Sequence, residues 1–160
     1  MSEKLEFSYN KTLKLKNVVY RDICVTDYES QESVFDLIVT QLENQIKAKG
    51  AEPIGPLIQY NTYFVDANGQ TNLNIRFIRQ ANQYLEAVDE PYNSEYEVTV
   101  RNCMYVRYKG PGEQLYFATQ KILLTAFEED IELKGDSYVV YIEDDEMGRI
   151  MADVFMERVE

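Results

Sequence analysis

Residues 57–79, LIQYNTYFVDANGQTNLNIRFIR, contain two alternating stretches separated by a tight turn. The turn, Asp66-Ala67-Asn68-Gly69, is a strong hairpin signal because Asn-Gly tolerates the positive φ angles that such a turn needs. The first stretch, residues 57–65, alternates between two faces, and the returning stretch, residues 70–79, places its large apolar side chains on one face. The sequence therefore predicts two antiparallel strands here.

The segments before this hairpin predict a strand and a helix. A β-rich run from Thr12 to Val25 is followed by a polar, turn-like stretch, Asp27 to Ser33, which offers a serine as helix N-cap. Apolar residues then recur at helical spacing from Val34 to about Lys49, and Gly50 follows as the expected C-terminal stop. Pro53-Ile54-Gly55-Pro56 is not expected in a central strand, because proline cannot donate a ladder hydrogen bond.

The second half of the chain repeats the same order of elements. A connector at residues 81–94 has no clear period, and Gly110-Pro111-Gly112 interrupts the pattern further on. The elements expected in this half are a strand at Glu95–Tyr108, a helix through Leu115–Ala126, and strands at Tyr138–Ile142 and Met151–Val159. A local echo supports the repeat, since Asn17-Val18-Val19-Tyr20-Arg21 resembles Asn102-Cys103-Met104-Tyr105-Val106-Arg107.

These patterns predict an α+β fold built from two β-α-β-β repeats in a pseudo-twofold arrangement. We expect the strands to form one antiparallel sheet with both helices on one face. Residues 1–10 are expected to form an N-terminal tail and residues 11–160 a single domain. Its halves are placed at about 11–80 and 95–160.

Composition excludes several classes of function. The 160 residues carry a formal net charge of −12, which argues against a nucleic-acid or anionic-membrane partner. No histidine is present, which removes the usual general base near neutrality and most zinc sites. Cys24 and Cys103 show no metal-ligand or redox spacing, so reduced, partly buried thiols are favoured over a disulfide or a catalytic thiol. The N-terminus shows no signal peptide, and a cytoplasmic protein is expected.

Three further motifs are better explained by structure than by ligand binding. The acidic runs 128–130 and 143–146 lack the spaced ligand pattern of a calcium loop, so we expect no metal site. Gly110-Pro111-Gly112 could cradle a phosphate at a helix N-terminus, but Glu113 already supplies the negative charge that this end favours. No cofactor is expected.

Several motifs, taken in order, resemble the GyrI-like family, the effector-binding domain of bacterial multidrug-responsive transcription regulators. Met104 to Glu113 resembles the family's strand that ends in an Arg-x-x-Gly-Pro turn, and Gly135 to Ile142 resembles its Gly-x-x-Tyr-Glu-x-Tyr strand. In the first half, Ile54 to Tyr60 resembles the Gly-Pro-x-x-x-x-Tyr strand. The resemblance covers residues 11–159. Val139 stands where the family has its pocket glutamate.

The resemblance implies a stand-alone, non-catalytic module that senses or sequesters a small amphipathic or aromatic molecule in an aromatic cleft. Alternation along the strands places six candidate ligand-binding residues on the sheet face away from the helices: Tyr63, Arg76, Arg101, Tyr105, Tyr141 and Asp153. Arg76 and Arg101 could pair with an anionic ligand, but cross-strand salt bridges to Glu143 or Asp153 are favoured for both.

Two other functions stay open at this point. The first is a protein-interaction adaptor, because an acidic surface can steer a basic protein partner. The second is a small-molecule hydrolase, since a subset of the family is described as hydrolytic. Without histidine, and with Val139 in place of the glutamate, Glu113, Glu143 or Asp153 would have to act instead.

Overall fold

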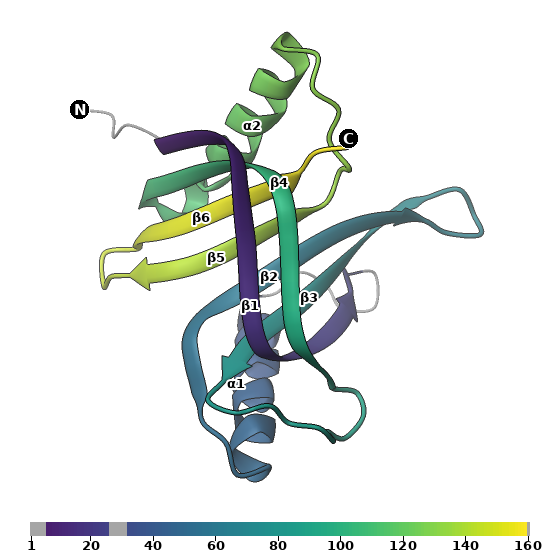
Figure 1. The fold of residues 1–160 in the computed structure, drawn as a ribbon, viewed down its shortest axis with the longest axis vertical. Coiled ribbons are helices and arrows are strands. Elements are labelled where there is room, and N and C mark those ends of the chain that lie inside the picture. Colours follow the sequence, from purple (N-terminus) through teal and green to yellow (C-terminus); the bar gives the residue numbers. More distant parts are fainter. Residues whose placement is uncertain (1–5, 26–31, 160) are drawn as a thin grey trace. The chain divides into compact units, whose positions relative to one another are not determined.

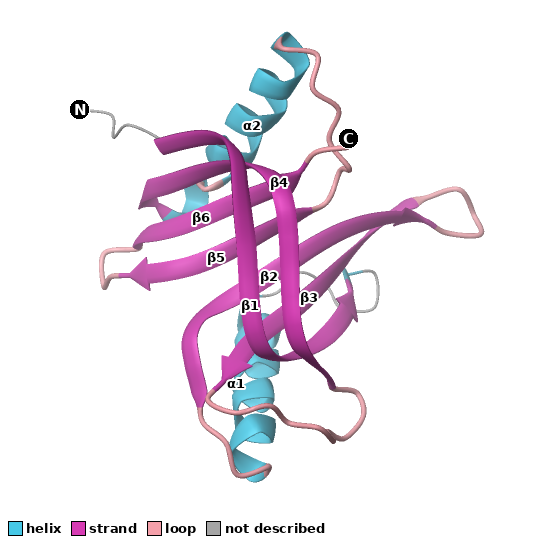
Figure 2. Cartoon of the chain, in the orientation of Figure 1, coloured by secondary structure: helices cyan, strands magenta, loops and turns pink. Residues whose placement is uncertain are grey.

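The computed structural model describes residues 6–25 and 32–159. Its elements follow the order β-α-β-β twice (Figures 1 and 2). They are β1 (Glu6–Cys24), α1 (Glu32–Ala48), β2 (Pro53–Val65), β3 (Thr71–Ala81), β4 (Asn93–Pro111), the short 3-10 helix η2 (Gly112–Gln114), α2 (Tyr116–Glu128), β5 (Ser137–Asp144) and β6 (Arg149–Glu157). The predicted α+β class and its repeat of elements are confirmed. The expected turn at 27–33 falls mostly on residues 26–31, outside the described part of the chain.

The chain divides into two compact units that are not contiguous in sequence. The N-terminal unit comprises residues 14–98, and the C-terminal unit comprises residues 1–13 together with 99–160. The strands β1 and β4 therefore each contribute to both units. This division differs from the predicted halves, and residues 6–10, expected in a tail, belong to β1.

The N-terminal unit packs α1 against one face of its antiparallel strands. β3 pairs with β1 on one side and with β2 on the other, with Ile23 opposite Ile75. Leu42 and Ile46 of α1 are fully buried in the core under these strands. The core residues are Val19, Ile23, Ile38, Leu42, Ile46, Ala51, Ile75, Phe77, Ala81 and Leu85.

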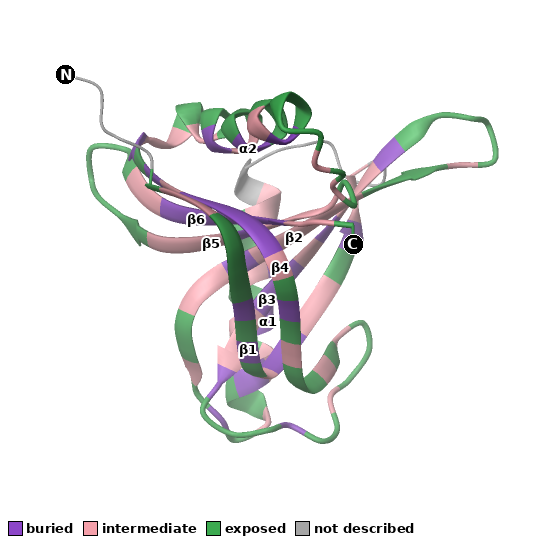
Figure 3. Ribbon diagram, turned by 45° about the horizontal axis from the view of Figure 1, so that its top comes forward, coloured by how far each residue is buried: buried purple, intermediate pink, exposed green. Residues whose placement is uncertain are grey.

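The C-terminal unit is built in the same way. β6 pairs antiparallel with β4 and with β5, and α2 packs Ala118, Ile122 and Ala126 against them. The core residues are Met104, Val106, Tyr108, Ala118, Ile122, Ala126, Val139, Ala152, Val154 and Met156. Figure 3 shows the buried stretches of the strands and the more exposed outer parts of the helices.

The two long strands are interrupted at equivalent asparagines. Asn17 and Asn102 have positive φ angles, 52° and 59°, in a region that asparagine tolerates better than most residues. Immediately afterwards the regular pairing begins, with Val18 opposite Gln80 and Cys103 opposite Glu157. The echo seen in the sequence is thus a shared backbone feature.

The hairpin turns of the two units also match. Asp66 accepts hydrogen bonds from the backbone N–H of Asn68 and Gln70, at 2.9 and 3.0 Å. Asp145 accepts the equivalent bonds from Met147 and Arg149, both at 2.9 Å. Each turn ends in a glycine with positive φ, which explains why an Asp-x-x-Gly sequence occurs twice.

The start of β2 differs from the prediction. β2 begins at Pro53, so the Pro-Ile-Gly-Pro stretch lies within a strand, and its register with β3 shifts between Ile54 and Ile58. A bulge of this kind accommodates the prolines, because residues inside it are not required to donate regular ladder bonds.

Neither described helix is long and apolar enough to cross a membrane.

Candidate ligand-binding site

The sheet face of the C-terminal unit that points away from α2 carries a tyrosine and an ion pair. Met104, Val106 and Val154 pack in the core with α2. Because strand residues alternate between faces, Tyr105 and Arg107 of β4 point to the opposite side. Their register partners across the ladder are Phe155 and Asp153 of β6.

The Asp153 carboxylate is held by three donated hydrogen bonds. The Tyr105 hydroxyl donates to Oδ1 at 2.8 Å, Arg107 Nε donates to the same oxygen at 2.8 Å, and Arg107 Nη2 donates to Oδ2 at 3.0 Å. Asp153 is only 8% exposed, so these bonds compensate the cost of burying its charge. The bond to Asp153 raises the pKa of Arg107 further above its usual value.

The ring of Tyr105 has an aromatic residue and a cation close to it. Phe155 lies at 5.0 Å between ring centroids, and the Lys11 ammonium lies 5.1 Å from the Tyr105 ring centroid. Burial, together with the hydrogen bond to Asp153, raises the pKa of Tyr105 to about 12. The hydroxyl is therefore a neutral donor at physiological pH, and the ring face can accept a cation.

The N-terminal unit carries a matching cluster on the corresponding face. Arg76 donates from Nε and Nη2 to the Asp22 carboxylate at 2.8 and 3.2 Å. The Arg76 guanidinium carbon lies 4.0 Å from the Tyr20 ring centroid and 5.8 Å from that of Tyr60. Here the cation over the tyrosine rings is supplied by the ion pair itself.

The two clusters occupy equivalent positions of the repeat with their charges exchanged. Tyr20 follows Asn17 by three residues, just as Tyr105 follows Asn102. Two residues later stand Asp22 in one unit and Arg107 in the other. Across the ladder their register partners are Arg76 and Asp153, respectively. Each unit therefore combines a tyrosine with a cross-strand ion pair, in opposite polarity.

The structure brings together only part of the predicted site. Tyr105 and Asp153 are in direct contact, and Arg76 occupies the equivalent cluster of the other unit. The favoured explanation of Arg76, a cross-strand salt bridge, is confirmed, although its partner is Asp22 and not Glu143 or Asp153. Asp153 is instead paired with Arg107.

The face assigned to Tyr63 and Tyr141 was wrong. Tyr63 is in register with Leu73, which packs against the core beneath α1, so it lies on the helix side. Tyr141 packs against the core of the C-terminal unit, and burial raises its pKa. Val139 also belongs to this helix-facing core. On the opposite face, the buried carboxylate is that of Asp153.

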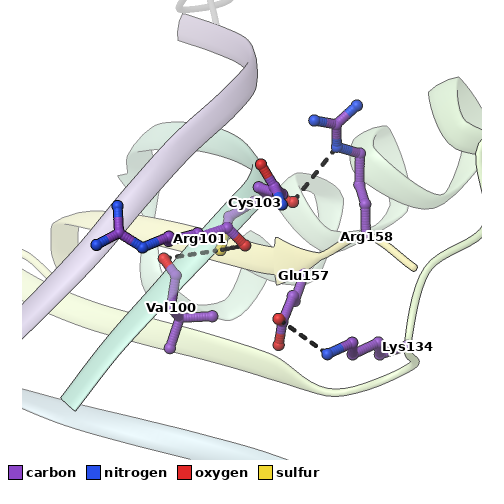
Figure 4. Close-up of polar contacts among 7 residues, drawn as sticks. Val100, Arg101, Cys103, Lys134, Glu157 and Arg158 are labelled. Atoms are coloured by element: carbon purple, nitrogen blue, oxygen red, sulfur yellow. Dashed lines mark hydrogen bonds and ion pairs between the residues drawn. The ribbon is translucent and has the colours of Figure 1, made fainter. Parts of the chain in front are cut away.

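Arg101 and Cys103 lie on either side of the Asn102 irregularity (Figure 4). Arg101 is exposed, and its side chain extends away from the Cys103 sulfur. Cys103 is buried, with Sγ 3.7 Å from the Val100 carbonyl oxygen and 3.8 Å from that of Arg101. Burial, with the nearby Glu157 and Asp136 charges, raises its pKa to about 11, so it is a protonated thiol at neutral pH and a poor nucleophile. Neither cysteine forms a disulfide.

Other features of the C-terminal unit are structural. Gly112 donates its backbone N–H to Gly148 at 2.9 Å, which uses one of the donors that a phosphate would need. A pocket of about 210 Å³ lies by the β5–β6 turn. Its lining includes the basic side chains Lys109 and Arg149 and the acidic side chains Asp144 and Asp145. Among the described residues, no group of acidic or cysteine side chains is arranged to hold a metal ion.

The sequence reasoning missed Tyr20, Tyr60 and Arg107. The signal that identifies two of them was present in the echo between the segments after Asn17 and Asn102. Placing these asparagines in register transfers the position of Tyr105 onto Tyr20, and that of Asp22 onto Arg107. Tyr60 had no such signal, because its position relative to Arg76 depends on strand register.

Comparisons with known proteins identify relatives in fold. No protein-family model and no curated protein matches the chain. Among solved structures, the EcmrR C-terminal domain superposes with a TM-score of 0.61 at 14% identity, over 98% of this chain and 96% of that domain. In the complex of EcmrR with DNA, the match covers 58% of the EcmrR chain, with a TM-score of 0.62 at 13% identity.

Two further structures show the same fold. A hydrolase from Listeria innocua matches with a TM-score of 0.55 at 12% identity, over 98% of this chain and 92% of that one. SAV2435 bound to tetraphenylphosphonium matches with a TM-score of 0.50 at 9% identity, over 99% of this chain and 94% of that one. The chain thus has the fold of the EcmrR C-terminal domain.

Proposed function

We propose that this protein is a non-catalytic module of the GyrI-like type that binds a small amphipathic molecule carrying an aromatic group. The observation that carries the proposal is the tyrosine and ion-pair cluster present at equivalent positions of both units. A tyrosine offers a ring face for stacking and a hydroxyl for hydrogen bonding. The fold supports the same conclusion, since one protein that shares it, SAV2435, is bound to an aromatic cation.

The ligand contacts we propose in the C-terminal unit centre on Tyr105. Its ring is partly covered by the exposed Lys11 side chain, whose ammonium marks a position where the ring accepts a cation. A ligand cation would displace Lys11 from this position, with Asp153 as the nearest buried carboxylate. Arg101 remains a proposed contact in this unit. In the N-terminal unit, taken by itself, Arg76 remains a proposed contact together with Tyr20 and Tyr60.

A non-catalytic role is supported by the chemistry of the candidate groups. The chain has no histidine, Cys103 is held as a protonated thiol, and the Asp153 carboxylate is engaged by Tyr105 and Arg107. Both oxygens of the Asp153 carboxylate already accept hydrogen bonds from these two side chains. The match to the hydrolase from Listeria innocua is a likeness in fold, and a shared fold does not imply a shared reaction.

The proposal is tested by thermal shift with two probes of the same shape and opposite charge, tetraphenylphosphonium and tetraphenylborate. Ligand at a hundredfold excess over its Kd stabilises the native state by about 2.7 kcal/mol, a rise of several degrees for a domain of this size. We expect the cation to raise the melting temperature. If neither probe shifts the melting temperature of the folded protein, the proposal is overturned.

Variants identify the site. Tyr105→Leu should weaken binding of the cation by about fivefold or more, because it removes the ring face. Lys11→Ala should strengthen binding of tetraphenylphosphonium, because the competing ammonium is gone. The same variant should not strengthen binding of tetraphenylborate. Lys47→Ala removes the same charge from the exposed last turn of α1 and serves as the matched control. Equal behaviour of the two lysine variants would contradict the assignment.

A further inference from the structure

The outer face of α2 exposes an unusual amount of apolar surface. Five large apolar side chains of this helix are exposed: Tyr116, Phe117, Leu123, Leu124 and Phe127. Phe127 is 81% exposed and Leu124 is 58% exposed. The core does not need them, because the helix already buries Ala118, Ile122 and Ala126 on its inner side. In Figure 3 the exposed stretches recur along α2.

The equivalent helix of the repeat gives an internal comparison. Among the described residues of α1, Leu37 is the one large apolar side chain that is exposed, at 56%. Its other exposed positions include Asp36, Gln41, Asn44 and Lys47, a composition typical of a solvated helix face. The two helices occupy the same place in their units, so the apolar outer face of α2 is not a requirement of the fold.

The spacing of these residues is that of a helix-packing seam. Tyr116, Gln120, Leu123 and Phe127 follow one another at intervals of four, three and four residues, the alternation found at the a and d positions of coiled coils. Leu124 and Phe117 flank this seam. Gln120 is the only polar member, and its amide can both donate and accept, so it can pair with a second copy of itself.

The area of this face is sufficient for a weak dimer. With whole side chains of on the order of 150–250 Å², five roughly half-exposed ones offer about 500 Å² per copy. This lies at the upper end of the apolar patches seen on monomers. Two copies together would bury about 1,000 Å², the lower limit for a specific interface.

We propose that the outer face of α2 is a homodimer interface, in which it packs against the same face of a second copy of this chain about a twofold axis. A twofold interface requires a self-complementary patch, which an apolar seam with one central glutamine provides. Acidic residues stand at both ends of the helix, at Glu113 and at Glu128 to Asp130. Two copies, each with a net charge of −12, therefore repel one another outside the apolar contact.

Because of this charge arrangement, the response of binding to salt distinguishes a homodimer from a complex with a basic protein partner. Salt screens like-charge repulsion, so the dimer should become tighter as NaCl is raised from about 50 to 500 mM. A basic partner attracted to the acidic ends would bind more weakly over the same range.

The test is sedimentation velocity of the full chain between about 5 and 200 µM, where an interface of this size is expected to associate with a Kd on the order of 10 µM. Leu124→Glu places a charge beside the seam, within the exposed apolar face of α2, and should raise the dimer Kd by about 30-fold or more. Leu37→Glu is the matched control, with the same substitution at a helix position of nearly equal exposure.

The outcomes are distinct. A dimer that is weakened by Leu124→Glu, unaffected by Leu37→Glu and tightened by salt supports the proposal. A wild-type protein that stays monomeric throughout the range, or a dimer that both variants weaken equally, would overturn it. Both substitutions are at exposed positions, so far-UV circular dichroism should verify native folding. These outcomes do not depend on whether the protein binds tetraphenylphosphonium.

Discussion

At the scale of single residues, the two ion pairs of the repeat differ in burial. The side chain of Asp153 is 11% exposed, and that of Asp22, the carboxylate of the pair in the other unit, is 38% exposed. We expect Asp153→Asn to reduce the free energy of unfolding by about 2–3 kcal/mol, because it removes the buried charge that pairs with Arg107 and replaces the oxygen that accepts from Arg107 Nη2 with an NH2 donor.

The matched control is Asp22→Asn, which breaks the exposed pair with Arg76. A solvent-exposed ion pair contributes little, so the expected loss is under about 1 kcal/mol. Urea denaturation followed by circular dichroism measures both losses. Equal losses for the two variants would mean that burial does not distinguish these pairs.

The same residues show how far the sequence predicts a site. Tyr105 and Asp153 were placed on the correct face because β4 and β6 are regular at these positions. Residues 63–65 at the end of β2 are all exposed, so burial along β2 gives no signal for the face of Tyr63, and Tyr141 lies next to a register shift. Hydrophobic alternation predicts a face only where one side of the strand is packed against a core.

At the scale of elements, the repeat was predictable because each strand, helix and turn carries its own local signal. The Asp-x-x-Gly turns and the helical spacing of α1 and α2 are examples. The division into units was not predictable. The strands β1 and β4 continue past the stretches that the apolar pattern predicts as strands, and each of them contributes to both units. Asn17 and Asn102 mark the points at which β1 and β4 are interrupted.

The backbone at Asn102 allows a sharp test of this feature. In a left-handed conformation alanine is strained and glycine is not, so Asn102→Ala should be less stable than Asn102→Gly by about 1 kcal/mol. Both variants lose the asparagine side chain, and only the cost of the positive φ differs between them. The measurement is the midpoint of urea denaturation.

The neighbouring residue supplies the control. Arg101 has no positive φ, so Arg101→Gly should be less stable than Arg101→Ala, the reverse order. If alanine were better than glycine at both positions, the left-handed backbone at Asn102 would be contradicted.

At the scale of the whole molecule, the excess of negative charge is expected to lower stability through self-repulsion. The 28 acidic side chains exceed the 16 basic ones by 12, so at least 12 carboxylates lack a basic partner of their own. The acidic β5–β6 turn concentrates several of them. Net repulsion of this kind is greatest at low ionic strength, because salt shortens the distance over which charges interact.

We therefore expect the melting temperature to rise by about 3–6 °C between about 20 and 500 mM NaCl, since screening of roughly 1–2 kcal/mol of repulsion corresponds to such a shift. The double variant Asp144→Asn/Glu146→Gln removes two charges from the acidic turn and should reduce this response, while Asp145 is kept because its carboxylate caps the turn. Differential scanning calorimetry at low protein concentration isolates the effect from self-association. A melting temperature that falls with salt would show instead that attractive ion pairs, such as Arg107–Asp153, outweigh the repulsion.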